Sequence, residues 1–188
     1  MNLSAIVRHY VRHSYPTHER ELSWFRHQAS LEETLKVAGR AENCHSKRYQ
    51  HQRRITRIAI ALATETLMEL HDRLQQSPSF HELWLLLRAH LKPIRGIGEL
   101  YIYDTAVRIG AYLNRVPERV YLHAGTRVGA RRFGLLPPRE AQRNWLKREE
   151  LPSILRTLPP SHVENLLCIY KHRWTGICKT GARITNHG

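Results

Sequence analysis

The segment Ile94-Arg95-Gly96-Ile97-Gly98 has the residue types of a phosphate-binding turn. It follows Lys92 and a proline, and it precedes a helix-forming run that begins at Glu99. Glycines let a backbone come close to a ligand, and a helix N-terminus exposes N–H groups at its positively polarised end. We therefore expect this turn to bind DNA phosphate, with the contacts made by Lys92, Arg95, Gly96, Ile97 and Gly98.

Asp104 is the candidate catalytic residue of the helix that follows. At about 100° per residue, few positions of this helix are fully solvated, so a carboxylate at Asp104 loses hydration and needs a partner or a function. Two interpretations stay open. Asp104 forms an i,i+4 ion pair with Arg108, or it is a catalytic carboxylate beside a pocket lined by Tyr101 or Tyr103.

A second candidate segment begins at Val120 and contains His123 and Arg127, which helical spacing brings together. They either face DNA and a flipped base or have a structural role at the surface. Gly125 and Gly129 lie one turn apart, and their small size favours close helix–helix packing.

A basic stretch precedes these segments. It mixes cations with an aromatic residue and amides, which is how proteins hold unstacked nucleic acid, although a solvated charged face is the alternative. The candidate DNA-binding residues in it are Lys47, Arg48, Gln50, His51, Arg53 and Arg54. The spacing of Cys44, His45, His51 and Cys168 does not match a zinc site, so we expect no metal and no cofactor.

Composition agrees with a polyanionic partner. The 188 residues carry 30 Lys and Arg against 16 Asp and Glu, a formal charge of +14. Such an excess most often indicates nucleic acid. No apolar run approaches the roughly 20 residues that span a bilayer, no signal peptide is evident, and three widely spaced cysteines indicate a reducing compartment. A cytoplasmic protein with no membrane contact is expected.

Apolar residues recur with helical periodicity, and no useful strand pattern or internal repeat is found. The sequence predicts an all-α fold, a helical bundle, as a single domain over residues 1–172 with a flexible tail over 173–188. The expected helices are an N-terminal helix that ends near Pro16, followed by helices over 19–40, 53–74, 80–91, 99–113, 117–132, 150–158 and 161–171.

The order of elements over about Leu83 to Leu135 resembles the helix-hairpin-helix DNA glycosylase superfamily: a short helix, Ile-Arg-Gly-Ile-Gly, a second helix, and a third helix with an Arg-Val…Gly-Leu ending. The resemblance implies that the hairpin binds the DNA backbone and that the target base is flipped into an interhelical cleft. Leu100 stands where bifunctional members have a lysine, so no Schiff-base lyase is expected. The segment Leu122–Thr126 lacks the usual catalytic Asp. Asp104 is therefore expected to replace this acid, and Glu99 is the second candidate.

The run Gly-Ile-Gly-Glu-Leu-Tyr-Ile-Tyr-Asp-Thr-Ala…Val-Tyr-Leu-His-Ala-Gly-Thr-Arg also resembles a small prokaryotic glycosylase group associated with antiphage defence. This implies removal of glucosylated hydroxymethylcytosine from phage DNA. The expected function is that of a monofunctional DNA glycosylase acting on double-stranded DNA with no obligate protein partner. Tyr101, Tyr103, His123 and Arg127 would line its base pocket. A noncatalytic DNA-binding protein that uses the same hairpin is the alternative.

Overall fold

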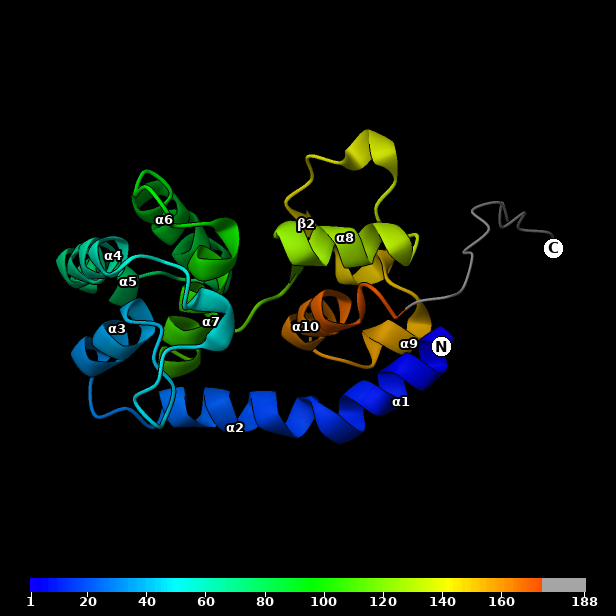
Figure 1. Cartoon of the computed structure of the whole chain (residues 1–188), viewed down its shortest axis with the longest axis horizontal. Helices are drawn as coiled ribbons and strands as arrows, with labels where there is room; N and C mark the ends of the chain where they lie inside the picture. The colour runs from blue at the N-terminus through cyan, green and yellow to red at the C-terminus, as the bar shows by residue number, and fades with distance from the viewer. Residues whose placement is uncertain (174–188) are drawn as a thin grey trace.

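Helices dominate the structure, as the apolar periodicity predicts. A computed structural model describes residues 1–173, which contain ten α-helices and one two-stranded sheet (Figure 1). The helices are α1 (Leu3–His13), α2 (Tyr15–Arg26), α3 (Leu31–Gly39), α4 (Arg57–Glu69), α5 (His71–Gln75), α6 (Phe80–Leu91), α7 (Glu99–Tyr112), α8 (Ala124–Arg132), α9 (Ser153–Arg156) and α10 (Pro160–Tyr170). The strands β1 (Val120–Tyr121) and β2 (Trp145–Leu146) pair antiparallel.

The expected helix over 19–40 is wrong, because the chain breaks after Arg26. Ser30 caps the next helix, since its side chain accepts a hydrogen bond from the Glu33 N–H. Pro16 does not stop the first helix by itself. It lies in the first turn of α2, where the missing N–H group of a proline costs the helix no hydrogen bond. Thus α1 and α2 follow each other with Ser14 alone between them.

Two other expected helices begin later than the sequence suggests. Thr56 caps α4, so residues 53–56 lie outside the helix, and a turn at Leu70 separates α4 from α5. The expected helix over 117–132 is wrong in its first half. There the chain forms β1, and His123 is the N-cap of α8. The expectation of no strand therefore fails at β1 and β2, whose pairing joins two segments distant in sequence.

Two hydrophobic clusters hold the fold together. The first is built on α2 to α7, and the second on α1, α8, α9 and α10 together with the sheet. Strand β1 connects them, because Val120 is buried in the second cluster and Tyr121 in the first. Helices α1 and α2 run along one side of both clusters (Figure 1). We call the two groups of elements the first and second lobes.

Helices α8 and α10 pack closely through glycines, as expected. A Cβ at Gly129 would lie 2.1 Å from the backbone oxygen of Leu167, and one at Gly125 would lie 2.8 Å from Cys168 Sγ. This contact brings the N-terminal end of α8 against one face of α10. Both helices thereby place side chains at the boundary between the lobes.

Within residues 1–173, no helix combines the length and the apolar character needed to cross a bilayer. The single domain expected over residues 1–172 would include both lobes. Apart from Arg173, the expected flexible tail lies outside the described residues.

Candidate functional site

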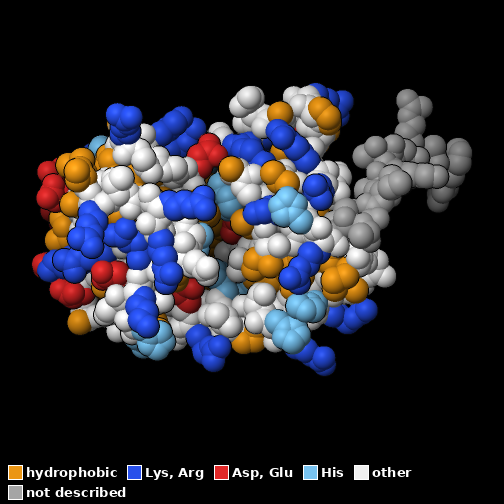
Figure 2. Space-filling model, viewed as in Figure 1, with side chains coloured by type: hydrophobic (Ala, Val, Ile, Leu, Met, Phe, Trp, Pro, Cys, Tyr) orange, Lys and Arg blue, Asp and Glu red, His pale blue; other side chains and the backbone are white. Residues whose placement is uncertain are grey.

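A cavity of about 320 Å³ opens between the two lobes, and we call it the cleft cavity. Figure 2 shows this hollow, with acidic and histidine side chains inside it and Lys and Arg side chains around it. Its walls come from α7 and α10, and the junction of α1 and α2 contributes a third side. The polar residues that line it include His51, Tyr103, Asp104, Arg108 and Glu164.

Asp104 lies on the α7 wall of the cleft cavity with 19 % of its side chain exposed. Its Oδ2 atom accepts hydrogen bonds from Gln52 Nε2 at 2.6 Å and His51 Nε2 at 2.8 Å. An Arg108 guanidinium nitrogen lies 3.8 Å from the same oxygen. The expected i,i+4 pair with Arg108 is therefore present, and the carboxylate also borders a cavity. The two interpretations of Asp104 are compatible in this structure.

Arg108 and Gln52 form a buried support for this carboxylate. Arg108 is 3 % exposed, and it donates from Nη1 to Gln52 Oε1 at 3.2 Å. Its guanidinium lies 4.0 Å from the centre of the Tyr49 ring. These contacts fasten the stretch around Tyr49 to α7. The stretch is thus part of the cavity wall as well as a basic surface.

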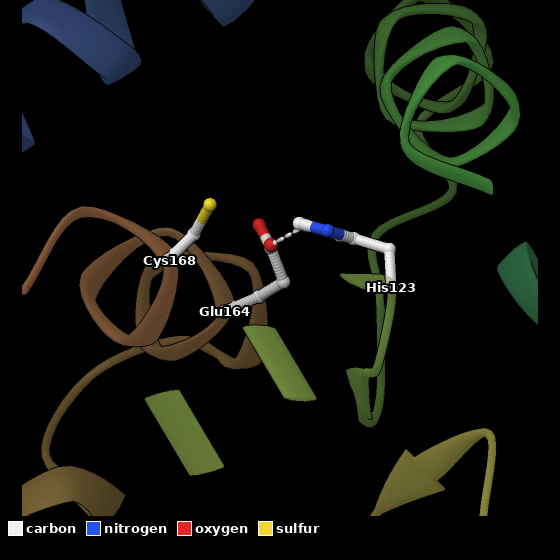
Figure 3. A group of neighbouring side chains, drawn as sticks. All are labelled: His123, Glu164 and Cys168. Carbon is white, nitrogen blue, oxygen red and sulfur yellow. Dashed lines mark hydrogen bonds and ion pairs between the residues drawn. The ribbon is translucent and has the colours of Figure 1, made fainter. Parts of the chain in front are cut away.

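Glu164 lies on α10 and points toward His123 (Figure 3), and it borders the cleft cavity. Its Oε1 atom accepts a hydrogen bond from the Thr126 hydroxyl at 2.6 Å and is hydrogen-bonded to His123 Nε2. His123 and Glu164 are 2 % and 6 % exposed. Burial alone would lower the pKa of His123, but the charge and hydrogen bond of Glu164 more than offset this effect and raise it. The arrangement favours a buried imidazolium–carboxylate pair.

Tyr103 borders the same cavity, and its hydroxyl has no hydrogen-bond partner among the described residues. Burial raises the pKa of this phenol well above its ordinary value, and the nearby carboxylates Glu164 and Asp104 raise it further. A buried hydroxyl without a partner is costly unless a ligand or water satisfies it. Tyr103 therefore keeps a neutral, buried hydroxyl without a partner beside the cleft cavity.

Cys168 lies one helical turn after Glu164 on α10. The ligand atoms of His123, Glu164 and Cys168 lie within 4.8 Å of one another (Figure 3). Burial raises the pKa of the Cys168 thiol to about 11. Among the described residues, these three are the group that could hold a metal ion.

The turn before α7 is open to solvent. Gly96 has φ of +96°, a left-handed conformation that favours glycine, and Gly98 is the N-cap of α7. No side chain caps this end, and a Cβ at Gly98 would meet no atom within 4 Å. Lys92 and Arg95 are exposed, whereas the Ile97 side chain is buried, so Ile97 offers only its backbone. The first N–H groups of α7 therefore lack a side-chain cap, and the space beside Gly98 is open.

A small second cavity lies beside this turn. It is lined by Lys92 and Glu99 together with Tyr103 and His123. Glu99 is 46 % exposed at its side chain and lies 3.9 Å from an Arg127 nitrogen. Arg127 also donates hydrogen bonds to the carbonyl groups of Ala141 and Arg143. Arg127 thus fixes the loop before β2, and it does not border the cleft cavity.

The remaining predicted residues lie apart from the cleft cavity, with the exception of His51, which borders it. The Tyr101 hydroxyl donates to the Gly39 carbonyl at 2.5 Å inside the first lobe, and Tyr101 borders neither cavity beside Tyr103. Arg48 donates to the Ile55 carbonyl at 3.0 Å. The other predicted contacts of the basic stretch are exposed, namely Lys47, Gln50, His51, Arg53 and Arg54.

Three site residues escaped the sequence reasoning: Gln52, Thr126 and Glu164. Glu164 carried a signal, because it is the one acidic residue of the expected helix over 161–171 and lies one turn from Leu167 on its apolar side. Gln52 and Thr126 carried no such signal, because the residues to which they are hydrogen-bonded are distant in the sequence or were themselves not predicted as site residues. No protein-family model, curated protein or solved structure matches this chain, so the site is interpreted from its own chemistry.

Proposed function

We propose that the protein is a monofunctional DNA glycosylase, which takes a flipped base into the cleft cavity and hydrolyses its N-glycosidic bond. The observation that carries the proposal is Asp104, a carboxylate fixed by Gln52 and Arg108 on the wall of a cavity of about 320 Å³. That volume is at the lower end of the range for small-molecule pockets, about 300 to 1,000 Å³. The net charge of +14 suits a polyanionic substrate.

DNA binding is assigned to the segment from α6 to α7, which we interpret as a helix-hairpin-helix. The open α7 N-terminus would receive a phosphate on its first N–H groups, and Lys92 and Arg95 would add charge beside it. The exposed cations of the basic stretch, such as Arg53, would contact the backbone on another side. Such contacts position a duplex without reading its sequence.

In the proposed reaction, the target nucleotide leaves the base stack and enters the cleft cavity. The Asp104 carboxylate stabilises the oxocarbenium-like sugar and orients the attacking water, as carboxylates do in glycoside cleavage. Tyr103 offers its free hydroxyl to the base or sugar. Glu164 provides a second carboxylate on the opposite wall, while Glu99 is exposed on the side of the second cavity. Leu100 holds the place of a lyase lysine, so the product is an abasic site.

The proposal is tested with duplex oligonucleotides that contain modified or unmodified bases, followed by alkali treatment to break abasic sites. Asp104→Asn is expected to abolish alkali-labile product while leaving the DNA dissociation constant unchanged. Asp72→Asn is the matched control, because Asp72 is 87 % exposed and distant from the cavity, and it should keep full activity. Full activity in Asp104→Asn would move the catalytic role to another residue.

The target base is proposed from the resemblance to the antiphage group, as glucosylated hydroxymethylcytosine in phage DNA. Free bases released from phage DNA and from host DNA would be identified by mass. A noncatalytic DNA-binding protein is the second candidate, which the open α7 N-terminus and the basic surface favour equally. Intact binding without abasic sites on any modified DNA would establish that alternative.

A further inference from the structure

The cluster of His123, Glu164 and Cys168 is built by two helices in close contact. His123 is the N-cap of α8, and Glu164 and Cys168 stand four residues apart on one face of α10. Their ligand atoms all lie within 4.8 Å of one another (Figure 3). The glycine contact between the helices makes this possible, because a side chain at Gly125 would collide with Cys168 Sγ.

We propose that these three residues bind a transition-metal ion of the Zn²⁺ class. An imidazole nitrogen, a carboxylate oxygen and a thiolate sulfur are all ordinary zinc ligands, with bond lengths of about 2.0 to 2.3 Å. Ligand atoms around a tetrahedral ion at those distances lie about 3 to 4 Å from each other. The three donors therefore need only small side-chain adjustments to surround one ion.

The surroundings fit a metal centre in two further respects. His123 is buried, and its Nδ1 atom has no hydrogen-bond partner among the described residues. The Thr126 hydroxyl already donates to the Glu164 carboxylate, and a partner of this kind orients a metal ligand. An ion would replace the direct His123–Glu164 hydrogen bond and leave the Thr126 contact in place.

Three protein ligands leave one position of a tetrahedral ion open. Because Glu164 borders the cleft cavity, that position would be accessible from the cavity and could take water or an oxygen atom of a bound molecule. The set of residues for which the sequence predicted no metal was Cys44, His45, His51 and Cys168. The set proposed here shares only Cys168 with it and adds Glu164 and His123. The proposal does not require the glycosylase proposal: the two share Glu164, but Asp104, the residue that carries the glycosylase proposal, is not a ligand.

The test uses the full-length protein, stripped with a chelator and titrated with Co²⁺, whose thiolate charge-transfer and d–d absorption bands report sulfur ligation and geometry. One equivalent should bind and give both kinds of band, and mass spectrometry should show that Zn²⁺ displaces it. Cys168→Ser should lose the charge-transfer band. Cys44→Ser is the matched control, because Cys44 is an exposed free cysteine outside the cluster, and it should keep the spectrum of the wild-type protein.

Glu164→Gln provides a second variant, with folding of each variant checked by circular dichroism. The Glu164→Gln substitution should weaken Co²⁺ binding by about tenfold or more, because the loss of a residue that only orients a ligand already lowers metal affinity by about 10- to 100-fold. The absence of saturable Co²⁺ binding by the wild-type protein would overturn the proposal. So would an unchanged charge-transfer band in Cys168→Ser, which would place the thiolate elsewhere in the chain.

Discussion

Gln52 joins the two charged residues of the α7 wall. Its amide nitrogen donates to Asp104 at 2.6 Å, and its carbonyl oxygen accepts from Arg108 at 3.2 Å. The side chain is 1 % exposed, so its amide group is buried between these two partners. Gln52 therefore keeps a carboxylate and a guanidinium in fixed positions beside the cleft cavity.

Replacing Gln52 with Leu should destabilise the fold by about 1 to 3 kcal/mol, because the buried Arg108 loses a hydrogen-bond acceptor and Asp104 loses one of its donors. Urea denaturation of the two proteins would measure the difference. Gln50→Leu is the control, since Gln50 is exposed two residues away, and its free energy of unfolding should change by less than about 0.5 kcal/mol. Equal effects of the two substitutions would show that the buried bonds contribute nothing specific.

At this scale the sequence could identify Asp104 and Tyr103, because both lie on one helix whose periodicity is visible in the chain. It could not assemble the walls of the cavity. Asp104 meets Gln52 across 52 positions of the chain, and His123 meets Glu164 across 41. Each pair forms when two distant segments of the same lobe pack together, which no local pattern encodes. Tyr101 illustrates the opposite case, since a hydroxyl expected in a pocket instead donates to the Gly39 carbonyl inside the first lobe.

Among the elements, the pair α8 and α10 depends most on a single residue. Gly129 brings the two backbones so close that an added Cβ would lie 2.1 Å from the Leu167 oxygen. A backbone oxygen cannot swing aside as the end of a flexible side chain can. The contact also supports the cluster of His123, Glu164 and Cys168, because it sets the distance between the α8 N-terminus and α10.

Gly129→Ala should therefore lower the free energy of unfolding by about 3 kcal/mol or more, as in strong overpacking. Gly98→Ala is the matched substitution, because a Cβ there meets no atom within 4 Å and the residue has φ of −103°. It should cost no more than about 1 kcal/mol, the value of an N-cap preference. Thermal and urea unfolding of both variants would measure the contrast, and a tolerant Gly129→Ala would contradict the close packing.

The presence of the helices could be predicted from the sequence more reliably than the residues at which they begin and end. Helix α6 has the bounds that its apolar pattern and Ser79 cap predict, and α7 begins at Glu99 as expected. The break between α2 and α3 was missed although Ser30 and Glu33 form a visible N-terminal signal, because apolar residues continue on both sides of it. Strand β1 was missed because two residues carry no periodicity and form a strand only when β2 pairs with them.

The whole molecule combines two hydrophobic lobes with one strongly positive charge. The lobes meet at a cavity whose walls carry carboxylates, while Lys and Arg side chains occupy the surface around it (Figure 2). This distribution suits a substrate whose phosphates stay outside while one neutral group enters. The charge total was available from the sequence, but its placement relative to the cavity required the fold.

If the turn before α7 binds phosphate, its cations should contribute to the salt dependence of DNA binding. Each phosphate contact adds about 0.9 to the slope of log affinity against log salt concentration. The double substitution Lys92→Ala and Arg95→Ala should reduce that slope by about 2, as measured by fluorescence anisotropy on duplex DNA between about 50 and 200 mM salt. The control is Arg139→Ala with Arg156→Ala, which removes the same charge from exposed positions on the second lobe. The net charge falls equally in the two double variants. A smaller slope in the first variant alone would therefore identify direct contacts at the turn. Equal slopes in the two variants would mean that the turn does not bind the DNA backbone.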